Sequence, residues 1–181
     1  MSWYLHHKMK SAKTTTMMAF RRAQTALVGA VAFLLTLLAL NNLTDYDSNF
    51  HYVEHVLSMD TTFPDNHLKW RALTHPIFHH LFYCTLILWE ATSAGLCWLG
   101  TIRLWRSWKS DSVSFHHAKG LAIYGLVLSM LQWLFAFLAV GGEWFVMWQS
   151  PTWNGQDAAL RMFVVTGMVL LFVSPLWEKE E

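Results

Sequence analysis

Apolar residues gather into four long runs along this chain of 181 residues, and polar segments separate the runs. The runs are Ala23–Leu40, Pro76–Leu99, Leu121–Val140 and Ala158–Leu176. As helices of about 18 to 24 residues they would extend about 27–36 Å, which matches the hydrocarbon thickness of a bilayer. The third run contains no charged residue, whereas a helix of a soluble bundle carries a polar stripe. We therefore predict an all-α fold, a four-helix transmembrane bundle, with residues 1–181 as a single membrane domain.

The segments 41–74 and 141–157 join the runs on one side of the bundle, and both show signals of their own structure. Apolar residues recur at helical spacing over 50–57, which predicts a short amphipathic helix capped by Asp47 or Ser48. A second short helix is predicted over Asn66–Leu73, before Pro76 starts the second span. The segment 141–157 is rich in tryptophan and turn residues, a composition typical of the membrane interface. We call these two segments the lid and expect short interfacial helices in it.

The distribution of lysine and arginine predicts the orientation. Hydrophobic residues make up 54% of the chain and charged residues only 14%, against about 25% in soluble domains. Nine basic residues lie in the N-terminal tail and after the second run, whereas only Lys69 and Arg71 lie in the lid. By the positive-inside rule, the tail 1–22, the loop 100–118 and both termini face the cytoplasm. We expect the first run to be an uncleaved anchor rather than a signal peptide. The net charge of +1 predicts no nucleic-acid partner.

Small residues predict how the helices pack. Pairs spaced four apart allow close approach of helix backbones, and three such pairs occur: Ala26/Ala30, Ala91/Gly95 and Gly125/Ser129. Cys84 and Cys97 lie about 20 Å apart on one predicted helix, too far for a disulfide. Both cysteines are therefore expected to be small packing residues.

Glu90 is a candidate functional residue because it lies well inside the second run. It follows Pro76 by about 21 Å of helical rise, and burying a charge in hydrocarbon costs roughly 2.5–3.5 kcal/mol. Gln132 on the antiparallel third run lies at an overlapping depth, so we predict a buried polar network of Glu90 and Gln132, which other polar residues could join: Thr36, Thr92, Ser93 and Ser129. Two interpretations stay open. The network either fixes helix packing or contributes a proton relay or a ligand contact.

Histidines gather at the lid side of the chain. Imidazole is the commonest metal ligand near neutral pH, so the sequence raises the hypothesis of a metal site. Its candidate ligands are His51, His55, His75, His79 and His80, with Glu54, Met59 and Met147 as additional donors. No other cofactor is predicted. A transmembrane haem is not expected, because its two histidine ligands would have to lie at one depth on facing helices.

Charged residues near the fourth run predict an ion-pair network. Asp157 lies four residues before Arg161 on one helical face, and Glu143 lies on the neighbouring lid segment. We expect Arg161 to bind these carboxylates and to hold the lid on the bundle. The chain contains no phosphate-binding glycine loop, nucleophile elbow or helical His-Glu-x-x-His motif, so catalysis has no positive support in the sequence.

Several segments of the lid and its borders resemble a known family. They are Asn41–Tyr46, His55–Pro64, Trp70–Ala72, Gly142–Phe145 and Met147–Ser150. They resemble a bacterial family of predicted small integral membrane proteins with a domain of unknown function, and the resemblance extends from the first span to the fourth. It implies the inner membrane of a Gram-negative bacterium, with the lid in the periplasm. The family has no assigned activity, so the resemblance transfers no catalytic residue.

Two functional hypotheses follow from these observations. The first is a non-enzymatic accessory or scaffold subunit of a membrane complex, with the lid as the partner surface for other membrane-protein subunits. The alternative is a small carrier or redox protein that binds a metal, a quinone or a lipid beneath the lid. In both cases the lipid bilayer surrounds the chain.

Overall fold

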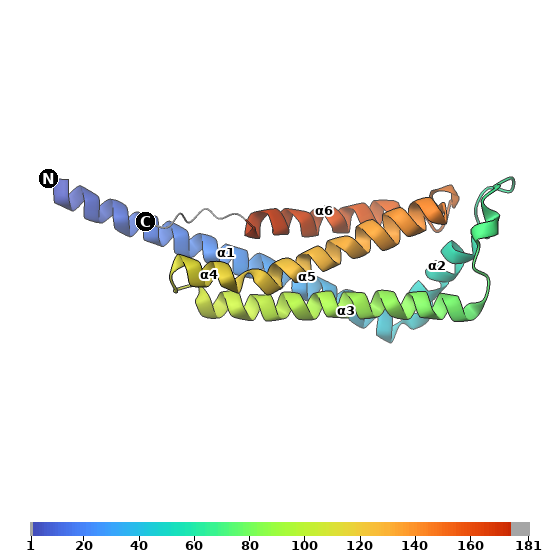
Figure 1. Cartoon of the computed structure of the whole chain (residues 1–181), viewed down its shortest axis with the longest axis horizontal. Helices are drawn as coiled ribbons and strands as arrows, with labels where there is room; N and C mark the ends of the chain where they lie inside the picture. Colours follow the sequence, from blue (N-terminus) through green and yellow to red (C-terminus); the bar gives the residue numbers. More distant parts are fainter. Residues whose placement is uncertain (1, 175–181) are drawn as a thin grey trace.

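The structure, a computed structural model, describes residues 2–174 and the side chains of residues 15–174. The described residues contain helices and turns but no strand, which confirms the predicted all-α class. Within them, four helices are long and apolar enough to cross a membrane: Thr15–Thr44, Pro76–Ser107, Ser112–Trp144 and Gln156–Val173. These four helices form one elongated bundle (Figure 1).

Nine elements follow one another in the described part of the chain. They are α1 (Ser2–Thr44), α2 (Tyr46–Ser58), the 3-10 turn η1 (Lys69–Arg71), α3 (Pro76–Ser107), α4 (Ser112–Ala118), α5 (Gly120–Leu131), the π-helix η2 (Gln132–Trp144), the 3-10 turn η3 (Met147–Gln149) and α6 (Gln156–Val173). The helices α2, η1 and η3 lie at one end of the bundle, here called the lid end (Figure 1). The opposite end carries α4 and is called the α4 end.

Helix boundaries differ from the predicted ones in several places. The predicted tail is helical from Ser2 and continuous with the first span, which runs on to Thr44 rather than ending at Leu40. The helix α6 ends at Val173, and the predicted end of this span at Leu176 lies outside the described residues.

The lid contains one of its two predicted helices. Helix α2 begins at Tyr46 after Asp45, so the predicted caps at Asp47 and Ser48 were wrong. The predicted helix over Asn66–Leu73 was also wrong, since this stretch contains only the turn η1. Its backbone bonds to other partners instead: the Asn66 side chain accepts from the Leu68 N–H at 2.8 Å, and the Leu73 N–H donates to the Leu57 carbonyl at 2.8 Å. Such local side-chain bonds compete with helix formation.

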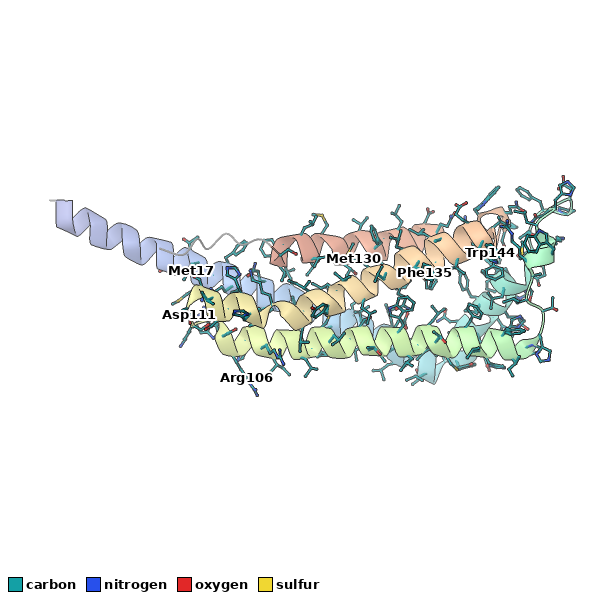
Figure 2. The ribbon with its side chains drawn as sticks, viewed as in Figure 1. Met17, Arg106, Asp111, Met130, Phe135 and Trp144 are labelled. Carbon is teal, nitrogen blue, oxygen red and sulfur yellow. The ribbon has the colours of Figure 1, made fainter. Side chains whose placement is uncertain are left out.

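Two hydrophobic cores hold the fold together. The first joins α1, α3, α5 and α6 with Phe115 of α4. The second lies at the lid end, where Val53, Val56 and Leu57 of α2 pack against Tyr83 and Ile87 of α3 and against a buried turn after η2. The exposed flanks of the bundle carry large apolar side chains along their length, including Phe135 (Figure 2). The lid therefore has its own core and rests on the bundle through α3 and η2.

Close approach of α3 and α5 depends on two glycines. A Cβ atom on Gly100 would lie 2.5 Å from the Ala122 nitrogen, and one on Gly125 would lie 2.7 Å from the Cys97 sulfur. The predicted packing role of Gly125 thus matches its position. Gly95 meets nothing within 4 Å and the paired Ala91 is exposed, so this pair does not mediate a helix contact.

The α4 end is organised around Arg21, whose side chain is 1% exposed. Its Nη1 donates to the carbonyl of Trp108 at 3.2 Å and to that of Ser110 at 2.6 Å, just beyond the C-terminus of α3. Its guanidinium also lies over the Phe115 ring, 4.5 Å from the centroid. A cation at this position satisfies carbonyls that the helix end leaves without partners. The sequence assigned Arg21 only a role in orientation.

The third span changes its hydrogen-bond pattern halfway along. It is an α-helix to Leu131 and a π-helix from Gln132 to Trp144. π-Helices are rare, occur mostly as single turns and are frequent at functional sites. At the change of pattern, the Trp89 indole N–H of α3 donates to the Leu128 carbonyl at 2.9 Å. Beyond this point the third span diverges from α3 toward the lid end (Figure 1).

Candidate functional site

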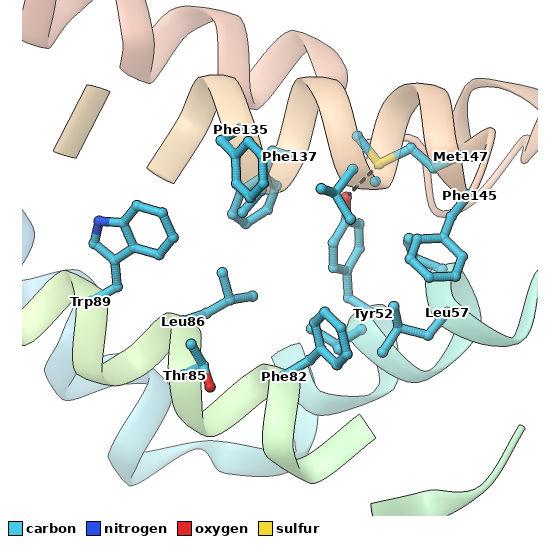
Figure 3. A pocket seen from close by; sticks show the side chains of 15 residues that line it. Tyr52, Leu57, Phe82, Thr85, Leu86, Trp89, Phe135, Phe137, Phe145 and Met147 are labelled. Atoms are coloured by element: carbon cyan, nitrogen blue, oxygen red, sulfur yellow. Dashed lines mark hydrogen bonds between the residues drawn. The ribbon is translucent and has the colours of Figure 1, made fainter. Parts of the chain in front are cut away.

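A pocket of about 190 Å³ lies where η2 diverges from α3, and α2 closes it at the lid end (Figure 3). Helices α2, α3 and η2 each contribute one wall, and the turn after η2 completes it. The lining residues are Tyr52, Val53, Val56, Leu57, Phe82, Thr85, Leu86, Trp89, Phe135, Ala136, Phe137, Val140, Gly141, Phe145 and Met147.

The pocket offers almost no polar group to a ligand. Only Tyr52 and Thr85 bring hydroxyl groups, and both hydroxyl hydrogens are used. Tyr52 donates to the Met147 sulfur at 3.1 Å, and Thr85 donates to the Leu81 carbonyl at 2.8 Å. Burial raises the pKa of Tyr52 to about 12, so its hydroxyl stays neutral at physiological pH. The interior is therefore apolar and uncharged.

The most exposed aromatic lining residues place the mouth of the pocket between α3 and η2. Phe82 is 38% exposed and Phe135 is 58% exposed, and they project from the two helices that diverge. Figure 3 shows Phe82 on α3 and Phe135 on η2, on opposite sides of the space that Leu86 and Phe137 also line. Since these helices are long and apolar enough to cross a membrane, we expect the mouth to face hydrocarbon.

Hydrogen bonds join the two lid segments to each other. The Thr61 and Ser150 hydroxyls are 2.8 Å apart, and the Phe63 N–H donates to the Gln149 side chain at 3.2 Å. Arg71 Nη1 donates to the Trp144 carbonyl at 3.2 Å. Arg71, which the sequence used only as a marker of orientation, therefore connects the two halves of the lid.

A strained turn places two lining residues. Val146 has φ 46° and ψ 41°, the left-handed conformation that β-branched residues rarely adopt. Such a conformation costs on the order of 1–3 kcal/mol and persists only when the surroundings enforce it. The residues on either side, Phe145 and Met147, are both buried and both face the pocket.

Glu90 forms the centre of a polar network below the pocket. Its side chain is 3% exposed and accepts two amide hydrogen bonds. Gln132 Nε2 donates to Oε1 at 3.3 Å, and Asn42 Nδ2 donates to Oε2 at 2.7 Å. Asn42 Oδ1 in turn accepts from Asn49 Nδ2 at 2.7 Å and from the Tyr83 hydroxyl at 3.3 Å. The network thus joins α1, α2, α3 and η2.

The four residues that could have joined this network bond elsewhere or lack a partner. Thr36 donates to the Ala32 carbonyl, Thr92 to Leu88 and Ser93 to Trp89. The Ser129 hydroxyl is buried, and no hydrogen-bond partner is found for it among the described residues. Asn42, which was missed, takes their place because α1 continues past Leu40.

Gln132 connects the network to the pocket. It is fully buried, it is the first residue of η2, and its Nε2 also lies 3.4 Å from the Leu86 carbonyl. Leu86 lines the pocket from α3, whereas η2 supplies the opposite wall. The side-chain amide of Gln132 therefore links η2 to α3 where the two walls of the pocket begin to diverge.

The five candidate metal ligands do not meet at one site. Instead, they bond to several different groups, and Glu54 is the one carboxylate that lies near two of them, His51 and His79. His51 pairs with Glu54 at 3.0 Å, His55 with Asp60 at 2.7 Å, and His80 with the Tyr46 hydroxyl at 2.9 Å. No group of three metal-binding side chains is found in the part of the chain that the structure describes.

The other two histidines support the start of α3. The His75 ring nitrogen accepts from the Ile77 N–H at 3.3 Å, which caps the helix before Pro76. His79 is 2% exposed, and its Nε2 lies 2.6 Å from the Leu73 carbonyl. Its Nδ1 lies 4.0 Å from a Glu54 oxygen. Both side chains therefore have structural roles at the lid end.

The predicted network of Glu143, Asp157 and Arg161 is not formed. All three residues are exposed, and in the described part of the chain no ion pair within 4.0 Å joins them. A different arginine, Arg71, joins the two halves of the lid, and its guanidinium lies 4.6 Å from the centroid of the Trp144 ring. Sequence spacing alone did not show that Arg71 reaches across the lid.

A ligand beneath the lid was one of the hypotheses, but the sequence analysis did not identify the residues that line the pocket. Its lining residues are mostly aromatic and aliphatic, which is what any transmembrane helix carries. The run of aromatic residues from Trp133 to Phe137 was the only local signal.

Comparisons with known proteins give the chain a family. No curated protein and no solved structure matches it. A family model described as "predicted small integral membrane protein" matches residues 20–175, most of the chain and all four spans nearly to their ends. The chain therefore belongs to the family of predicted small integral membrane proteins with the domain of unknown function DUF2165.

Proposed function

We propose that this multi-pass membrane protein binds a hydrocarbon chain of a lipid in the pocket at the lid end. The observation that carries the proposal is a cavity with apolar walls and a mouth that opens between two membrane-spanning helices. An apolar cavity of about 150 Å³ in a protein core stays dry and takes up benzene. A pocket of about 190 Å³ therefore encloses a short length of chain, while the rest of the lipid stays in the bilayer.

Among the three ligands of the carrier hypothesis, the pocket favours the lipid. A quinone head group needs hydrogen-bond donors, and both lining hydroxyls already donate to protein atoms. A metal ion needs several oxygen, nitrogen or sulfur donors, which an apolar wall lacks. The proposed role is therefore that of a lipid carrier or lipid sensor. The accessory-subunit role stays a prediction, with crosslinking in native membranes as its test.

We further propose that the protein lies in a bacterial inner membrane with both termini in the cytoplasm. The excess of lysine and arginine near the N-terminus and after the second span supports this orientation. Arg106 and Asp111 lie at the end opposite Trp144 (Figure 2). In this orientation the pocket opens into the periplasmic leaflet.

Filling the pocket is expected to abolish lipid binding. The probe is a fatty acid with a photoreactive group in its chain, incorporated into vesicles that contain the full-length protein. We expect labelling of peptides around Leu86 and Phe137 in the unmodified protein. In Ala136→Trp, the added indole occupies the cavity, and labelling of those peptides should fall by about tenfold, the equivalent of about 1.4 kcal/mol of binding energy.

The matched control is Ala91→Trp, which adds the same side chain to an exposed position of α3 away from the pocket. Its labelling around Leu86 and Phe137 should match that of the unmodified protein. Equal labelling of all lipid-facing helices, with no loss in Ala136→Trp, would show that the pocket holds no lipid. Thermal unfolding of both variants separates loss of the pocket from loss of the fold.

A further inference from the structure

A charge on Glu90 would be compensated only in part by its surroundings. Its two contacts are amide hydrogens of Asn42 and Gln132, and no ion pair to Glu90 is found within the described residues. A charge buried without a counter-ion is strongly disfavoured in a membrane interior. A proton on the carboxyl group removes that charge.

Two buried polar atoms of the third span lack a hydrogen-bond partner among the described residues, and one of them belongs to Gln132, which contacts Glu90. Gln132 Oε1 and Ser129 Oγ both belong to fully buried side chains and have no hydrogen-bond partner in the described part of the chain. They lie three residues apart on one helix, hence on one face. If a proton binds Glu90 at Oε1, the new O–H becomes a donor. Rotation of the Gln132 amide then turns its unpartnered oxygen toward that donor.

A short polar path leads from Glu90 to the surface at the lid end. Asn42 is half-buried and Asn49 is exposed, and their side chains form consecutive hydrogen bonds from Glu90 outward, each 2.7 Å long. Only these two amides separate the carboxyl group from the surface at the lid end.

Few other titratable groups face this site. Tyr83 interacts electrostatically with Glu90, and also with Asp45, Tyr46 and Cys84 at the junction of α1, α2 and α3. Over 23–44, α1 has no titratable residue, whereas α5 and η2 have only Tyr124 and Glu143, both exposed. Glu90 is thus the one carboxyl group in the middle of the described spans.

We propose that Glu90 is an exchangeable proton site supplied from the lid end and that its protonation opens the lipid pocket. The second half of this inference rests on the proposed lipid binding. The proton comes from water at the lid end and forms an O–H bond at Oε1, which leaves the side chain neutral. Gln132 then gives up its contact with the Leu86 carbonyl to accept from Glu90. The tie between α3 and η2 weakens, and lipid exchanges faster.

Infrared difference spectroscopy on the full chain in vesicles tests the proton site. Between about pH 5 and about pH 9, a band of protonated carboxyl should appear and disappear, and it should be absent in Glu90→Gln. The matched control is Glu143→Gln, which removes an exposed carboxyl of η2 and should keep the band. A spectrum of Glu90→Gln identical to that of the unmodified protein would overturn the proton site, whether or not lipid binds.

Exchange of the photoreactive fatty acid tests the coupling. In the unmodified protein the exchange rate should rise about threefold as the pH falls, the change expected for loss of about one hydrogen bond. In Glu90→Gln, whose amide imitates the neutral acid, the fast rate should hold at every pH. The same pH dependence in Glu90→Gln would overturn the coupling. An absence of labelling at any pH would refute lipid binding, while the infrared band still decides the proton site.

Discussion

Replacing Gly100 by alanine is expected to destabilise the bundle by about 3 kcal/mol or more. Overpacking in well-packed cores costs about 1–3 kcal/mol, and more where the obstacle is rigid. Here the obstacle is backbone, because the added Cβ would lie 2.5 Å from the Ala122 nitrogen and 2.6 Å from its Cα. Helices α3 and α5 would have to separate. Unfolding in mixed micelles with increasing SDS measures the loss.

The control for this substitution lies on the same helix. Gly95→Ala adds the same methyl group where no atom lies within 4 Å, and Gly95 is exposed. It should leave stability unchanged or raise it slightly, because alanine favours helix by up to about 1 kcal/mol over glycine. Equal stability of the two variants would contradict the close crossing of α3 and α5 at Gly100.

Replacing Arg21 by methionine should also lower the free energy of unfolding, by about 2–4 kcal/mol. The side chain keeps a similar length but loses two hydrogen bonds to the carbonyls of Trp108 and Ser110 and its contact with the Phe115 ring. Leaving a buried polar group unpaired costs about 1–3 kcal/mol, and two carbonyls are affected. We expect faster hydrogen exchange and faster proteolysis at the turn between α3 and α4.

Arg22→Met separates this effect from a change in membrane orientation. Both substitutions remove one positive charge from the same segment, so their influence on the positive-inside rule is equal. Arg22 is exposed and lies 4.0 Å from the centroid of the Trp108 ring, a contact worth about 0.5–1 kcal/mol. If both variants lost the same stability, Arg21 would have no special role at the α4 end.

The spans and the Glu90–Gln132 contact were predictable because they depend on length and depth alone. Four apolar runs of bilayer length leave few alternatives to a helical bundle. A constant rise of 1.5 Å per residue places two positions of antiparallel helices at one level without further knowledge. Asn42 was missed because the predicted first run ends at its last apolar residue, Leu40. The helix α1 itself continues to Thr44 and so includes Asn42.

Other features depend on contacts that spacing cannot show. The exposure of Gly95 and the burial of Gly100 follow from how α3 is rotated about its axis. The sequence does not indicate this rotation, because apolar residues occur on every side of α3. Likewise, the histidines share a region of the sequence, but their rings bond to carboxylates, a carbonyl, a hydroxyl and a backbone N–H that sequence spacing does not place. The pocket results from the divergence of η2 from α3, which a hydrophobicity pattern does not record.

The π-helix also determines which changes of length the third span can accept. Each of its hydrogen bonds encloses one more residue than in an α-helix. Shortening the stretch 133–139 can therefore be absorbed by a return toward α-helical bonding without breaking the span. The residues beyond the deletion would then point in a new direction about the helix axis, because each α-helical residue turns the chain by about 100°. Phe145 and Met147 would leave their places beside Tyr52, so the span would survive the deletion and the pocket would not.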